Sequence, residues 1–492
     1  MCKGCNLIER FTEKTVYYFL LGILVVSVLC FFPCVVIHII RYPDLFSVTE
    51  FVWLVPAVLL VWLTYVLGAG VSVHTKYISP ISLAFICSNV LFLSFLLTFD
   101  SIPTTDWKHV WSAANQMAQG TYTDGVKNGS YMHEIPYQLG FAYFQSLIIR
   151  CFGANYAVIR FFNLIMMNAM LWIVYHFSKR KTNEHVAGYA IMASGLFLSW
   201  SMTIGVMTNH VIGFLLLYLS LYLYEKDKLW TCVLSGIALA CLHFVRPMAA
   251  VVLATIFCYA IYRWIKGDKL TRVVSNIVGF YLGFLAVCFM LDTLLLSLGY
   301  TDIYVSQSKR NIYHKITYTT YESKVDGTIA DYNYDYEAYD AAYKAELFDM
   351  LTNHSDEIAL GIANKMCRYL GLLDYGFEMT YNHDEAIWKK YPIKAIYSIQ
   401  WFQYIIYLLI GILGYLKYRK THETDLYQIF FIGNTLIYIF IEAFTSYRFE
   451  NYLYLLFLVG YGMSEMGDKS KMAKRALSCE DSTVALESDC GV

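Results

Sequence analysis

Residues 100–122 read D-S-I-P-T-T-D-W-K-H-V-W-S-A-A-N-Q-M-A-Q-G-T-Y, and a polar link joins them to S-Y-M-H-E-I-P-Y-Q-L-G at residues 130–140. Strongly apolar sequence lies on both sides of this polar break. An acidic residue at the end of an apolar run is costly to place at a membrane surface, so ionisable groups there are functional candidates. The stretch therefore predicts a reaction site at a membrane face.

The composition of the whole chain supports a membrane protein. Of its 492 residues 58% are hydrophobic and only 15% charged, and the mean hydropathy is +0.47. Runs of about 20 apolar residues, each long enough to cross a bilayer core of about 30 Å, recur throughout. We predict an all-α integral membrane protein with about twelve transmembrane helices. The expected spans cover residues 16–39, 51–70, 81–99, 154–177, 185–204, 208–224, 229–245, 248–264, 273–297, 394–416, 425–444 and 449–465.

The distribution of basic residues predicts the orientation, because cytoplasmic loops are rich in Lys and Arg. With both termini in the cytoplasm, basic clusters such as 179–181, 263–272 and 417–420 fall inside, and the short outer turns hold only Arg41, Arg246 and Arg448. We therefore expect a multi-pass protein of the cell membrane.

The same topology divides the chain into six regions. These are three N-terminal spans (1–99), an outer catalytic loop with two interfacial helices (100–153), a core of six spans (154–297), a small Tyr-rich outer segment between spans nine and ten (298–393), three C-terminal spans (394–465) and a disordered cytoplasmic tail (466–492).

The first outer loop has the pattern of a helix lying in the membrane interface. Between residues 104 and 120, one helical face carries Trp107, Val110, Trp111, Ala114 and Ala118. A helix with two Trp residues on its apolar face is suited to the interface. A second helix is expected at residues 136–152.

Asp106 falls in the first turn of the first expected helix, where the helix dipole favours an ionised carboxylate. Such a group can accept a proton. Asp100 is the competing candidate for this role, and Asp106 is also well placed simply to cap the helix.

The second outer segment is rich in tyrosine and acidic residues, with ten Tyr between Tyr300 and Tyr343. Asp335-Tyr336-Glu337 has a D-x-E spacing that holds a metal in some nucleotide-sugar enzymes. A single triplet does not supply the several converging oxygens that a hard cation needs. We therefore expect a solvated surface here, and no metal or other cofactor is indicated, although a divalent metal stays possible.

Four charged residues are predicted near the outer ends of spans: Arg246, Asp292, Glu442 and Arg448. Arginine at such a depth is suited to a phosphate group through charge-assisted hydrogen bonds. The alternatives are an internal pair between Glu442 and Arg448, or contacts with lipid headgroups.

Taken in order, these motifs resemble the GT-C membrane glycosyltransferases. That superfamily includes protein O-mannosyltransferases, lipid A aminoarabinose transferases and bacterial polyprenyl-phosphate-sugar transferases. The resemblance rests on D-W-K-H-V-W-S-A-A-N-Q-M-A-Q-G at 106–120, Y-x-x-x-I-P-Y-Q-L-G at 131–140, F-G-A-N-Y-A-V-I-R-F-F-N at 152–163, R-P at 246–247 and E-x-x-x-x-x-R at 442–448. It extends over residues 80–465.

The resemblance implies transfer of a sugar from a polyprenyl-phosphate donor to a hydroxyl of a glycan, lipid or protein on the outer membrane face, by a single inverting displacement. It implies that Asp106 is the general base and that Arg246 and Arg448 bind the lipid phosphate. Glu442, His133 and Gln138 are further candidate substrate contacts, and no nucleic-acid partner is implied. In relatives the acidic loop commonly follows the first span, whereas here it follows the third.

Two other membrane functions are compatible with the pattern. A transporter or flippase of lipid-linked saccharides predicts interrupted spans and a repeat between halves. A polymerase or ligase of such saccharides shares the outward-facing site.

Overall fold

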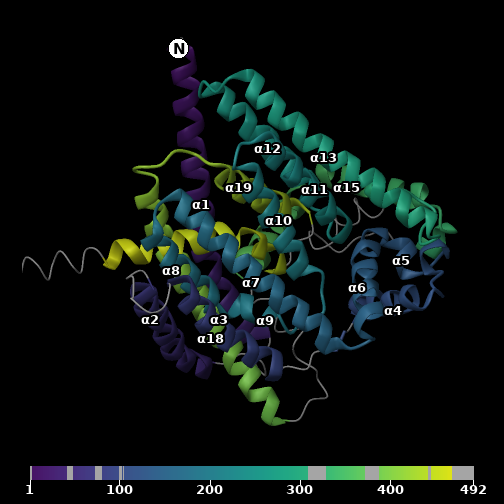
Figure 1. The fold of residues 1–492 in the computed structure, drawn as a ribbon, viewed down its shortest axis with the longest axis horizontal. Helices are drawn as coiled ribbons and strands as arrows, with labels where there is room; N and C mark the ends of the chain where they lie inside the picture. Colours follow the sequence, from purple (N-terminus) through teal and green to yellow (C-terminus); the bar gives the residue numbers. More distant parts are fainter. Residues whose placement is uncertain are drawn as a thin grey trace, which may run out of the picture.

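The computed structural model describes residues 3–41, 48–71, 80–98, 102–103, 105–307, 329–371, 387–441 and 445–467. Over these residues the regular structure is entirely helical, with no β-strand (Figure 1). This confirms the predicted all-α class.

The predicted apolar runs are helical in the structure, with one of them divided between α8 and α9. Their bounds are α1 Lys3–Arg41, α2 Leu54–Val71, α3 Pro80–Thr98, α7 Tyr156–Lys181, α8 Glu184–Gly195, α9 Leu198–Thr203, α10 His210–Tyr224, α11 Leu229–Val245, α12 Ala249–Ile265, α13 Leu270–Ser297, α18 Ile387–Tyr418 and α19 Leu426–Phe440. A last helix follows over residues 452–467. Polar side chains mark several starts: Asn155, Asn183 and Asp425 each accept a hydrogen bond from a first-turn N–H of α7, α8 and α19.

Six helices in the described part of the chain are long and apolar enough to cross a membrane. They lie within 8–36, 50–70, 81–98, 156–181, 270–297 and 395–418. Four more apolar helices, α10, α11, α12 and α19, are shorter. The multi-pass character is therefore confirmed, whereas the count of about twelve spans and the orientation of the termini stay predictions.

The span predicted at residues 185–204 is not one unbroken helix, because the chain breaks between α8 and α9 at residues 196–197. The side chain of Gln403, from α18, completes the hydrogen bonding of the broken turn. Its Oε1 accepts from the N–H of Leu198 at 3.0 Å, and its Nε2 donates to the carbonyl of Leu196 at 2.8 Å. An interrupted helix is tolerated in an apolar interior when its free backbone groups find such partners.

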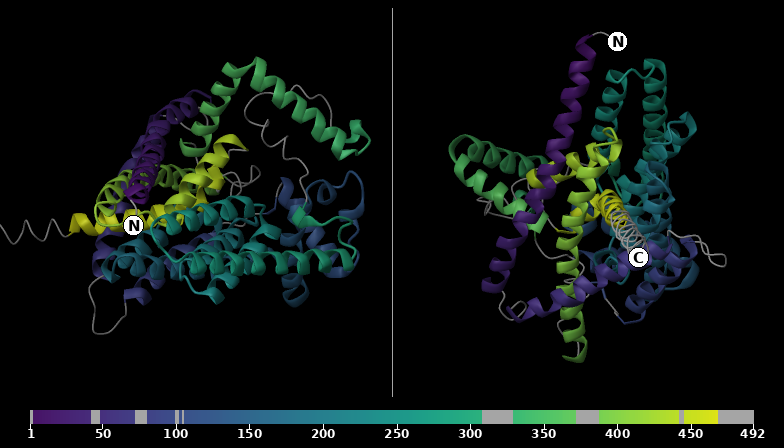
Figure 2. Two further views of the ribbon diagram at one scale, coloured as in Figure 1. Left: turned by 90° about the horizontal axis from the view of Figure 1, so that it is seen from above. Right: turned by 90° about the vertical axis from the view of Figure 1, so that its left-hand side faces the viewer.

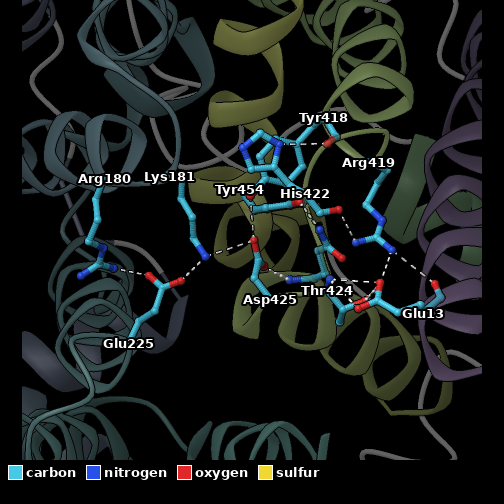
Figure 3. A network of polar contacts seen from close by, with 11 residues as sticks. Glu13, Arg180, Lys181, Glu225, Tyr418, Arg419, His422, Thr424, Asp425 and Tyr454 are labelled. Atoms are coloured by element: carbon cyan, nitrogen blue, oxygen red, sulfur yellow. Dashed lines mark hydrogen bonds and ion pairs between the residues drawn. The ribbon is translucent and has the colours of Figure 1, made fainter. Parts of the chain in front are cut away.

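A network of charged and polar groups joins helices that are far apart in sequence (Figure 3). Lys181, at the end of α7, pairs with Glu225 and lies 3.3 Å from the carboxylate of Asp425 at the start of α19. Glu13 of α1 pairs with Arg419 and accepts the N–H of Thr424 at 3.0 Å. These contacts fix α1, α7 and α10 to the turn between α18 and α19.

Two further groups of helices belong to the regions predicted as outer, and those of the first lie at the opposite end of α11 from that network (Figure 1). The first region contains α4 Thr105–Gln119, η2 Asp124–Val126, α5 Tyr131–Glu134, η3 Pro136–Gln138 and α6 Leu139–Phe152, which lie together beside the end of α11 (Figure 1). The second region contains α15 Tyr336–Asn353, α16 Ser355–Met366 and the π-helical turn η6 Cys367–Gly371. α15 and α16 form an arm that projects from the bundle in both views of Figure 2.

We expect Gln403→Leu to lower the stability of the protein. The substitution leaves a buried N–H and a buried carbonyl without partners, at a cost of about 1–3 kcal/mol each. The measurement is the midpoint of thermal unfolding of the purified protein in detergent.

Gln400→Leu, on the same helix, is the matched control. Gln400 is also buried, but its Nε2 donates to the hydroxyl of Ser199, at 2.8 Å, and not to the broken backbone. An equal loss of stability for both variants would contradict the role assigned to Gln403.

Candidate active site

The helix predicted at residues 104–120 is present as α4, and its apolar face packs inward. Trp107, Val110 and Ala114 are buried, and Asp106 stands exposed in the first turn. Trp107 contacts the aromatic ring of Phe141 on α6, with ring centroids 6.1 Å apart. The buried face thus fixes α4 on α6 and leaves the Asp106 carboxylate accessible.

The hydroxyl of Tyr131, on α5, lies next to Asp106 and to the amide of Gln138. It makes no hydrogen bond of normal geometry with any described residue. Burial, followed by the charge of Asp106, raises the pKa of the Tyr131 hydroxyl, so that it stays protonated at neutral pH. A protonated hydroxyl beside a carboxylate can orient the carboxylate or a bound hydroxyl group.

Asn209, at the start of α10, connects this loop to the turn that carries Arg246. Its Nδ2 donates to the Gln138 Oε1 at 3.3 Å and to the carbonyl of Val245 at 2.7 Å. Gly140 of α6 makes a second connection, because a Cβ at that position would overlap the carbonyl of Phe244. The structure therefore connects Gln138 to the turn that carries Arg246, and the hydroxyl of Tyr131 lies between Gln138 and Asp106.

Arg246 is the first residue after α11, and Pro247 behind it prevents the helix from continuing. Its side chain is buried, and its Nη2 lies 2.9 Å from the Oε1 of Glu450, a carboxylate with no exposed surface. The guanidinium lies over the rings of Tyr447 at 4.9 Å and Phe214 at 5.6 Å. Arg246 is therefore held in a buried pocket of aromatic rings with one carboxylate.

The pairing of Arg246 with Glu450 is incomplete. Neither the Nη2 of Arg246 nor the Oε2 of Glu450 has a hydrogen-bond partner of good geometry among the described residues. The Oε1 of Glu450 also accepts from the hydroxyl of Tyr438, at 3.1 Å. Buried charges normally satisfy their hydrogen bonds, and those that do not are candidates for ligand contact.

Arg448 is buried on a different side of the same segment. Tyr447 and Glu450, three residues apart in the 3-10 helix η7 Thr445–Asn451, both reach Arg246. Arg448 lies instead over the ring of Tyr404 at 4.0 Å, and its Nε donates to the hydroxyl of Tyr452 at 3.0 Å. Arg246 and Arg448 therefore contact different aromatic and polar partners around η7.

The remaining candidates separate from this group. His133 faces the Tyr-rich segment of residues 298–393, with its Nε2 3.8 Å from Asp302 and its Nδ1 3.3 Å from the hydroxyl of Tyr336. Asp292 accepts the N–H of Ser306 at 3.1 Å, which fits a structural role. Glu442 and Asp100 lie outside the described residues.

The D-x-E triplet has a structural explanation in this fold. Asp335 caps α15, and its Oδ1 accepts from the N–H groups of Glu337 and Ala338 at 3.0 and 3.1 Å. Within the described ranges, no group of three or more His, Cys, Asp or Glu side chains is arranged to hold a metal ion.

Comparison with known proteins identifies the family that part of this chain resembles. Residues 136–291 match the family described as dolichyl-phosphate-mannose-protein mannosyltransferase. The match confirms the resemblance to the GT-C type and supports a membrane glycosyltransferase. The matched segment includes Gln138, Asn209 and Arg246, whereas Asp106 and Glu450 lie outside it. No curated protein matches the sequence of the chain.

Sequence reasoning missed three residues of the site: Tyr131, Asn209 and Glu450. Glu450 lies in the same stretch as Arg448, so a buried acid there was a visible signal. Its partner, however, is 204 positions earlier in the sequence (450 minus 246), and no local spacing indicates that pairing.

We expect Gly140→Ala to displace η3 and the start of α6 from the Arg246 turn, because the added methyl meets backbone atoms of Phe244 that cannot move aside easily. Amide hydrogen exchange should become faster in residues 136–145. Gly22→Ala in α1 is the control, since a Cβ there meets nothing within 4 Å. Unchanged exchange in the Gly140 variant would contradict the close packing of the loop on this turn.

Proposed function

We propose that this protein transfers a sugar from a polyprenyl-phosphate donor to an acceptor hydroxyl on the outer membrane face. The observation that carries the proposal is the hydrogen-bonded connection from Gln138 through Asn209 to the turn of Arg246, with the hydroxyl of Tyr131 between Gln138 and Asp106. It combines an accessible carboxylate with a buried guanidinium, which are the two charges that such a transfer needs. The family match supports the same reaction class.

In the proposed reaction Asp106 acts as general base. Its carboxylate takes the proton of the acceptor hydroxyl while that oxygen bonds to the anomeric carbon of the donor sugar. The bond from the anomeric carbon to the phosphate oxygen breaks, and polyprenyl phosphate leaves with the electron pair. A single displacement of this kind inverts the anomeric configuration. Tyr131 is well placed to orient either Asp106 or the acceptor.

Arg246 and Arg448 are proposed to bind the donor phosphate. A guanidinium offers two parallel N–H donors to phosphate oxygens and stabilises the negative charge of the leaving group. Arg246 is the stronger candidate, because its Nη2 is buried without a well-aligned hydrogen bond to a described residue. The acceptor is a hydroxyl of a glycan, lipid or protein.

The interrupted helix does not favour the transporter alternative. In transporters, broken helices expose backbone groups and helix ends to a substrate. Here the side chain of Gln403 occupies both the free N–H and the free carbonyl at the break. This buried, neutral amide therefore stabilises the broken helix and does not leave these backbone groups open to a substrate.

We expect Asp106→Asn to lower kcat for sugar transfer by about 10²–10⁴-fold, the usual contribution of a general base. The assay uses purified protein in detergent with a polyprenyl-phosphate sugar, and membrane insertion should be unchanged because Asp106 is exposed. Asp100→Asn, measured in the same assay, shows which of the two aspartates is the base. Asp356→Asn, at an exposed position of α16, is the neutral control.

Turnover by Asp106→Asn at the wild-type rate would refute this mechanism. If only the Asp100 variant lost activity, the role of base would pass to Asp100.

A further inference from the structure

Glu450 occupies the position in the site at which an anionic ligand of Arg246 would be expected. Its carboxylate is fully buried and lies 2.9 Å from the Nη2 of Arg246. Taking two opposite charges out of water costs several kcal/mol for each ion, and their attraction offsets this only when geometry and hydrogen bonding are good. The Nη2 and the Glu450 Oε2 both lack a well-aligned partner among the described residues, so this pair is poorly optimised for stability alone.

Glu450 has a neutral partner that remains when Arg246 moves away. The hydroxyl of Tyr438 donates to its Oε1 at 3.1 Å. This hydrogen bond allows the carboxylate to stay in place while the guanidinium turns to another anion.

Arg246 likewise has contacts that do not depend on Glu450. The rings of Phe214 and Tyr447 hold its guanidinium through cation–π interactions. Its charge therefore stays within the pocket when its ionic partner changes. A phosphate offers more charge and more acceptor oxygens than one carboxylate, so it can compete for the guanidinium.

We propose that Glu450 is an internal counter-ion that pairs with Arg246 in the empty protein and is displaced by the phosphate of the lipid donor. This inference rests on the proposed function, because it requires an anionic lipid ligand for Arg246. The donor phosphate takes over Arg246, and Glu450 keeps its hydrogen bond from the hydroxyl of Tyr438. Glu450 is then a positioning residue that stabilises the empty site and weakens donor binding.

The proposal predicts opposite effects of Glu450→Gln on stability and on affinity. Without the counter-ion, the buried charge of Arg246 is uncompensated, so the thermal midpoint of the ligand-free protein falls. The same uncompensated charge attracts the phosphate without competition, so the Kd for polyprenyl phosphate falls, by about tenfold for each 1.4 kcal/mol of lost competition. A residue with a purely structural role would lower stability without tightening binding.

The experiment measures binding of polyprenyl phosphate, in detergent, to the wild-type protein and to Glu450→Gln, together with thermal midpoints with and without the lipid. Glu50→Gln is the matched control, because Glu50 is another buried carboxylate and is hydrogen-bonded to Ser398 at 2.9 Å. It should lose stability without a change in Kd. Glu450→Asp shortens the carboxylate side chain, so it should lower the thermal midpoint and the Kd for polyprenyl phosphate by smaller amounts. This variant replaces Glu450→Gln in the experiment if Glu450→Gln does not fold.

The outcomes separate the inference from the proposed function. If the wild-type protein binds polyprenyl phosphate and the Glu450 variants bind it equally or more weakly, the counter-ion role is wrong and the proposed function stands. If the wild-type protein does not bind the lipid phosphate at all, the proposed donor is wrong, and the counter-ion role fails with it. Tighter binding by a less stable Glu450 variant supports both.

Discussion

Polar groups that leave water must find their partners inside the protein, because hydrocarbon offers no hydrogen bonds. This constraint determines how the helices of this chain are joined. Gln403 pairs the backbone at the break between α8 and α9. Lys181 lies between the carboxylates of Glu225 and Asp425 where α7, α10 and α19 meet. In both places a polar contact between distant parts of the sequence holds apolar helices in a defined arrangement.

The same constraint separates structural from functional polar groups. The amide of Gln403 is neutral and makes its hydrogen bonds to backbone groups on both sides of the break. The pair of Arg246 and Glu450 is charged, fully buried and poorly aligned. A protein that needed only stability would gain little from such a pair, since a well-packed apolar replacement is often as stable. The free-energy cost of burying this charged pair is explained if the guanidinium of Arg246 is kept available for a ligand.

Much of the helical framework could be predicted from sequence, because apolar runs and helical periodicity are local properties. The face of α4 that carries Trp107 and Val110 is apolar as its spacing indicates, and it packs on α6, whereas its location in the membrane interface stays a prediction. The break after α8 was not predictable in this way, since the apolar run continues through residues 196–200 and the side chain that permits the break lies on α18. The sequence indicates Arg246 through its depth and the R-P motif, whereas its pairing with Glu450 depends on the approach of η7 to the end of α11.

The late position of the acidic loop, after three helices, has little consequence for the geometry of the site. α4 packs on α6, and Trp107 also lies 6.1 Å from the ring of His210 at the start of α10. By contrast, α2 packs against α8 and α18, and α3 packs against α7 and α8. The elements that position Asp106 and Arg246 therefore follow the loop in sequence. Since the contacts described for the site come from these later elements, helices added before the loop can extend the bundle without moving the carboxylate relative to the guanidinium.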